Sequence, residues 1–134
     1  PVELAQRFVN AFKEANPEIE IIQYTLPNEP HLKNCLTFEV PYVTYYLLSK
    51  EDNCRGFVSI DSSLQHFLSG IKPGVVIWGH SLPEAFGYSS NTNVIQKCRR
   101  DDILYMNLLG PSGAKIDYIK PEELLDIVCK NLIK

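Results

Sequence analysis

The sequence predicts one α+β domain: a mostly antiparallel sheet of about five to six strands, with N- and C-terminal helices packed on it. Three observations lead to this class. The 134 residues fit one ordinary domain, residues 1–134. Apolar residues recur at helical spacing near both ends, whereas short apolar runs separated by turn residues fill the middle. No linker or internal repeat divides the chain.

Composition excludes several classes of protein. Hydrophobic residues make up 45% of the chain and charged residues 22%, which is typical of a globular domain rather than a disordered one. The longest apolar runs are far too short to cross a bilayer, so we expect no membrane partner. We also expect no nucleic-acid partner, because the net charge is −3 and the most basic cluster, Lys97, Arg99 and Arg100, is followed at once by Asp101 and Asp102.

Two amphipathic helices are predicted at the ends of the chain. Residues 2–15 carry an apolar stripe at helical spacing, and Asn16-Pro17 ends that helix: Leu4, Ala5, Phe8, Val9, Phe12. Pro121 begins the last helix, in which Glu122 and Glu123 favour the first turn through the helix dipole. Each helix has one face to bury, and we expect the sheet to cover it.

Extended segments are predicted in the first half of the chain. Residues 18–26 and 36–40 alternate between apolar and polar side chains, which is typical of half-buried strands. Residues 50–53 resemble the turns that join antiparallel strands, so residues 56–60 are expected to pair back on the strand before them.

A third extended stretch, residues 42–48, is rich in aromatic side chains. Alternation along a strand would send Tyr42, Thr44 and Tyr46 to one sheet face and apolar neighbours to the other. Either both faces are covered within the monomer, or one of them meets a partner. Tyrosine is enriched at the centres of protein interfaces, so Tyr42 and Tyr46 are candidate binding residues.

A short helix and a central strand follow. Residues 61–63 offer N-cap side chains, and apolar residues then repeat at helical spacing until Pro73. Residues 74–78 form a short apolar strand, and residues 79–93 are expected to be the longest loop. Residues 94–100 suit either a short helix or a strand. Residues 103–109 and 114–119, which flank Gly110-Pro111-Ser112-Gly113, predict a hairpin.

The segment with the strongest functional pattern is Trp78-Gly79-His80-Ser81, where an apolar strand delivers polar side chains into the long loop. His80 could act as a general base or a ligand contact, and Glu84 could orient it. A plain structural role competes with this interpretation. The candidate binding residues are therefore Trp78, His80, Ser81, Glu84, Tyr42 and Tyr46, and no catalytic residue is assigned.

Two other patterns have structural explanations. His66 lies close to Asp61, Ser62 and Ser63, but helix capping explains those serines better than a Ser/His/Asp site does. The four cysteines have no metal-site spacing, so we expect no metal and no cofactor: Cys35, Cys54, Cys98, Cys129. Reduced thiols in the cytoplasm or nucleus are expected, with two disulfides as the alternative.

These observations favour a non-enzymatic protein–protein interaction domain: an adaptor, a regulator or a subunit of a larger assembly. It would bind a protein partner or another copy of itself through a sheet face, a strand edge or the loop of residues 79–93. The alternative is a small enzyme or ligand-binding protein with its site at His80, Ser81 and Glu84. Whether the chain is an enzyme is left open at this point.

Overall fold

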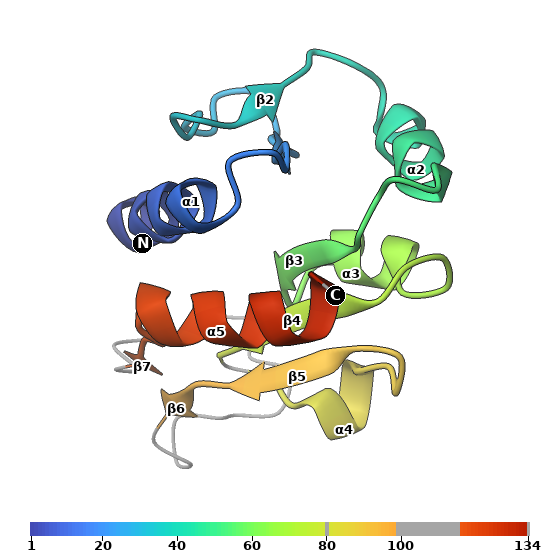
Figure 1. Ribbon diagram of the computed structural model, residues 1–134. Helices are drawn as coiled ribbons and strands as arrows, with labels where there is room; N and C mark the ends of the chain where they lie inside the picture. The colour runs from blue at the N-terminus through green and yellow to red at the C-terminus, as the bar shows by residue number, and fades with distance from the viewer. Residues whose placement is uncertain (80, 99–115, 134) are drawn as a thin grey trace.

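A three-stranded parallel sheet lies at the centre of the computed structural model, which describes residues 1–79, 81–98 and 116–133. The strands are adjacent in chain order: β3 (Phe57–Ile60), β4 (Gly74–Trp78) and β5 (Thr92–Ile95). Because all three run in the same direction, their carboxyl ends meet at one edge of the sheet (Figure 1).

The predicted antiparallel sheet of five to six strands is therefore wrong. A chain that forms neighbouring parallel strands must return between them, and α3 (Ser63–Leu68) and α4 (Pro83–Phe86) lie in these two connections. The strand predicted at residues 56–60 is confirmed as β3, one residue shorter, and residues 74–78 are confirmed as the central strand. Its error was the pairing, since the turn at residues 50–53 follows a helix and offers no strand for β3 to fold back on.

The strand prediction for residues 42–48 is also wrong, because these residues belong to α2 (Tyr42–Lys50). Aromatic and aliphatic side chains occur all along this segment, so its hydrophobic pattern has no clear period from which to distinguish a strand from a helix. In the helix, Tyr45 and Ser49 are buried, one turn apart. Pro41 lies just before the helix, where its missing N–H leaves no helical hydrogen bond unmade.

The two terminal helices are confirmed, as α1 (Val2–Ala15) and α5 (Pro121–Leu132). Figure 1 shows α5 crossing one face of the central sheet, and α1 lies against α5. Arg7 Nη2 of α1 lies 2.8 Å from Glu122 Oε1 of α5. Val75 of β4 is fully buried in the cluster formed on this face: Phe12, Val75, Leu124, Val128, Leu132.

The opposite face of the sheet is covered by α3. Successive strand residues point to opposite faces, so Val76 and Trp78 face away from Val75. Both are fully buried, in a second cluster with Phe57 of β3 and Leu68 of α3. The sheet is thus apolar on both faces, as expected for parallel strands between helices.

The predicted strands 18–26 and 36–40 are far shorter in the structure, where they form the parallel pair β1 (Ile22–Gln23) and β2 (Leu36–Thr37). Side chains hold the connection between them. Gln23 Nε2 donates to the Pro30 carbonyl (3.0 Å), and Gln23 Oε1 accepts from the Leu32 N–H (2.7 Å).

The last small sheet pairs β6 (Lys97–Cys98) with β7 (Ile116–Asp117) in antiparallel fashion. Residues 94–100, which the sequence left ambiguous, thus include the end of β5 and all of β6. Residues 103–109 and the turn at 110–113 of the predicted hairpin lie outside the described residues, as do Arg99 and Arg100. No helix in the described part of the chain is long and apolar enough to span a membrane.

Candidate functional site

Asp61 connects two chain segments at the carboxyl edge of the parallel sheet. It directly follows β3, whereas Ser81 lies in the connection that leaves β4. Ser81 Oγ donates a hydrogen bond to Asp61 Oδ2, and Gln65 Nε2 of α3 donates one to Asp61 Oδ1 at 2.9 Å. Gln65 is fully buried. Through its bond to Ser81, the Asp61 carboxylate joins the connection after β3 to the connection after β4.

His66 lies beside this carboxylate, but the three groups are not arranged for nucleophilic catalysis. His66 Nε2 is 4.0 Å from Asp61 Oδ1, and its Nδ1 is 3.1 Å from the Tyr88 hydroxyl. In a Ser/His/Asp site the imidazole lies between the hydroxyl and the carboxylate and accepts the serine proton. Here the carboxylate lies between Ser81 and His66, so the histidine does not contact the hydroxyl that it would activate.

The sequence predicted that the serines near His66 cap a helix, and the structure confirms the N-cap position but not the capping hydrogen bond. Ser62 is the N-cap residue of α3, but its side chain makes no capping hydrogen bond. Its Oγ lies 3.2 Å from Ser59 Oγ instead. Ser62 therefore hydrogen-bonds back to Ser59 of β3, whereas Asp61 hydrogen-bonds to Ser81 and Gln65.

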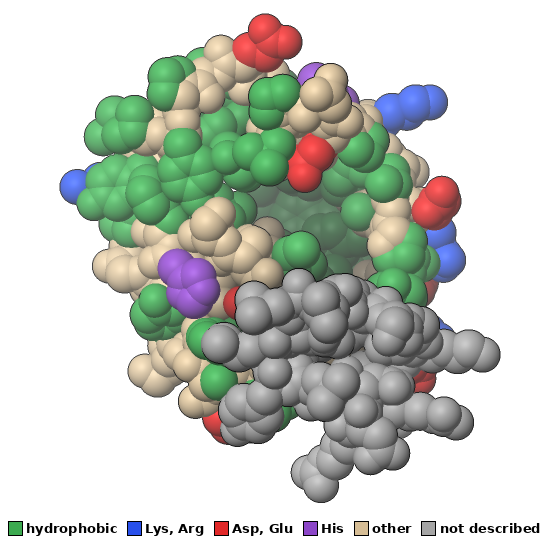
Figure 2. Space-filling model, turned by 180° about the vertical axis from the view of Figure 1, so that it is seen from behind, with side chains coloured by type: hydrophobic (Ala, Val, Ile, Leu, Met, Phe, Trp, Pro, Cys, Tyr) green, Lys and Arg blue, Asp and Glu red, His purple; other side chains and the backbone are tan. Residues whose placement is uncertain are grey.

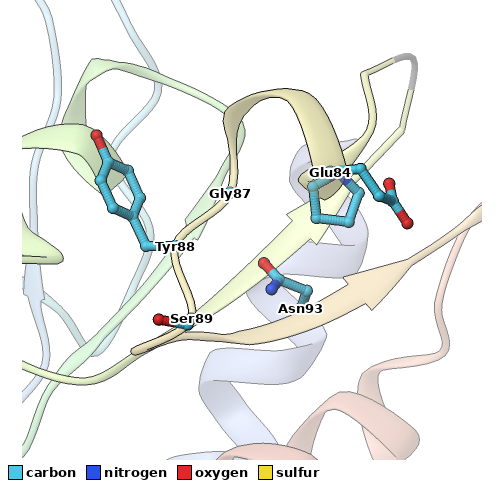
Figure 3. Close-up of a pocket in the computed structure, with 6 residues that line it drawn as sticks. Glu84, Gly87, Tyr88, Ser89 and Asn93 are labelled. Carbon is cyan, nitrogen blue, oxygen red and sulfur yellow. The ribbon is translucent and has the colours of Figure 1, made fainter.

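The structure places Ser81 and Glu84, the predicted loop residues that it describes, in different surroundings. Glu84 borders a shallow depression of about 300 Å³. Figure 3 shows the Glu84 carboxylate pointing away from Asn93. The lining residues are Pro83, Glu84, Gly87, Tyr88, Ser89 and Asn93. Ser81 is not among them, and it binds Asp61. His80 lies outside the described residues.

Trp78 is placed in the core rather than at a binding surface. Its side chain is fully buried, and its Nε1 donates to Asn93 Oδ1 of the neighbouring strand at 2.8 Å. This hydrogen bond satisfies the one polar group of the indole, as expected for a buried tryptophan.

Tyr42 and Tyr46 lie on the inward side of α2, where both rings pack against Phe67 of the α3 helix. The ring centroids are 4.5 Å and 4.9 Å from that of Phe67, in edge-on geometry. Tyr24 stacks edge-on with Tyr42 and Tyr45, both at 4.9 Å. Burial, followed by the nearby Tyr42 hydroxyl, raises the pKa of Tyr24 above its ordinary value. Tyr42 and Tyr46, which the sequence predicted to meet a partner, thus pack against other aromatic rings of the same chain.

The outward side of α2 carries the exposed apolar residues that the sequence prediction missed. Val43 and Leu47 are one helical turn apart, and each is 55% exposed. We define the α2 surface as the exposed apolar side chains on this helix and just before it: Phe38, Val40, Val43, Leu47 and Leu48. Figure 2 shows hydrophobic side chains gathered at its upper left, where α2 lies in this reversed view, and a hollow lined by hydrophobic side chains beside them.

Exposed apolar side chains are also frequent in the chain segment that precedes this surface. More than half of the exposed large hydrophobic side chains in the described residues fall between positions 22 and 48, including Ile22, Leu26 and Leu36. Ile22 and Leu36 are register partners across β1 and β2. Single exposed hydrophobic residues are ordinary, whereas contiguous exposed apolar patches are typical of interaction sites.

The described residues hold no group of three or more His, Cys, Asp or Glu side chains that could bind a metal ion. Three of the four cysteines are free thiols there: Cys35, Cys54 and Cys129. Burial raises the pKa of the Cys35 thiol above its ordinary value, although the nearby Lys13 acts in the opposite direction. Because Cys35, Cys54 and Cys129 are free, the described part of the chain gives no support to the alternative of two disulfides.

Comparisons with known proteins add no family to these observations. The chain matches no protein-family model, no curated protein and no solved structure.

Proposed function

We propose that this chain is a protein-interaction domain that binds a protein partner through the α2 surface. The observation that carries the proposal is the exposure of Val43 and Leu47, one turn apart on a helix whose other side is packed inside the molecule. An amphipathic helix needs only one apolar side to pack in a monomer. A second apolar side contributes favourable free energy only when another surface covers it and removes it from water.

The size of this gain follows from the exposed fractions. Full burial of a valine or leucine side chain contributes about 1.5–3 kcal/mol. Val43 and Leu47 are each 55% exposed, so a partner that covers both would gain roughly 1.5–3 kcal/mol from this pair together. The remaining members of the α2 surface add to that figure, and an apolar surface of this kind is typical of the buried core of an interface.

The alternative, a ligand site at the loop of residues 79–93, has less support. Ser81 contacts Asp61, whereas Glu84 borders a shallow depression and its side chain points outward (Figure 3). Small-molecule sites are usually concave and enclose most of the ligand surface. The depression beside Glu84 does not have that form.

Site-specific photocrosslinking tests the proposal. A photoreactive amino acid replaces Leu47 in one version of the chain and Val2 in another, since Val2 is also helical and is 47% exposed. We expect a protein crosslinked from position 47 and not from position 2. That protein is then purified and titrated against the wild-type chain, Leu47→Glu and Val2→Glu.

The expected result is a loss of affinity of at least about tenfold for Leu47→Glu, because a carboxylate would be buried against apolar atoms. Val2→Glu should bind as the wild type does. Equal crosslinking from both positions, or equal affinity of both variants, would refute the proposal. Circular dichroism of each variant checks that the helices are retained.

A further inference from the structure

We draw no further inference here: the strongest candidate, the exposed apolar side of α2 that includes Val43 and Leu47, carries nothing beyond the proposed function, because nothing in the described part of the chain shows what covers it.

Discussion

Gly74→Ala tests how tightly β3 and β4 pack. Gly74 is the register partner of Phe57, and it is buried. A β-carbon at this position would overlap the Phe57 ring, at 2.5 Å from Cε2 and 2.6 Å from Cε1. Phe57 is only 7% exposed, so its ring has no open space to move into without displacing other residues of the core.

The expected effect combines two opposing terms. Overpacking a close-packed core typically costs about 1–3 kcal/mol. Replacing glycine by alanine restricts the unfolded chain and returns about 0.4–1 kcal/mol. We therefore expect Gly74→Ala to lower the free energy of unfolding by about 1–2 kcal/mol, measured by urea titration with circular dichroism.

The matched control is Gly70→Ala. Gly70 is exposed, and a β-carbon there would meet nothing within 4 Å. This variant should be neutral or slightly stabilising, by up to about 1 kcal/mol. Trimming the ring with Phe57→Leu should make Gly74→Ala less harmful than it is in the wild type, since the two changes act on one contact. Gly74→Ala as stable as Gly70→Ala would refute the packing described for this strand pair.

Three further predictions concern polar contacts. Asp61→Asn and Ser81→Ala should be coupled by about 1–3 kcal/mol in a double-mutant cycle of unfolding free energies, because they share a charge-assisted hydrogen bond, whereas Asp61→Asn and the exposed-site change Ser89→Ala should be additive. Trp78→Phe should lower the free energy of unfolding by about 1–3 kcal/mol through the lost hydrogen bond to Asn93 and the lost volume, and unaltered urea midpoints would count against it. The pKa of Glu122 is held below its ordinary value of 4.5 by its own backbone N–H and then by the Arg7 guanidinium, so its stabilising effect is present above that pH and is lost as the pH falls through the lowered pKa. Unfolding free energies of the wild type and Glu122→Gln should therefore converge in acid, and a constant difference from pH 7 to pH 3 would contradict this account.

Local sequence signals predicted the elements that have a clear apolar period. The stripe that includes Phe8 and Phe12 predicted α1, and Pro121 marked the first residue of α5. The α3 helix was predicted in the same way, because one side of it is apolar and the other carries exposed residues such as His66. The apolar run 74–78 was predicted as a central strand with its observed bounds.

The candidate site was predicted only in part. The sequence indicated that residues 42–48 are apolar on two sides, which left open whether both sides are covered within the monomer or one meets a partner. In the structure one side of α2 is exposed. Because a strand was predicted where a helix forms, the wrong residues were assigned to the binding side. Strand alternation pointed to Tyr42 and Tyr46, whereas in the helix Val43 and Leu47 are exposed. The contact between Ser81 and Asp61 was missed because antiparallel strands would not bring the residues after β3 and β4 to one edge.

By itself, then, this sequence determined where apolar stripes begin and end, because helix period, caps and prolines act over a few neighbouring residues. Only the tertiary structure decided the strand directions and the state of residues 42–50. Strand direction depends on the path of the chain through α3 and α4, and α2 depends on Tyr24 and Phe67, which contact it from distant parts of the sequence. Those contacts leave Val43 and Leu47 facing outward, where a partner can reach them.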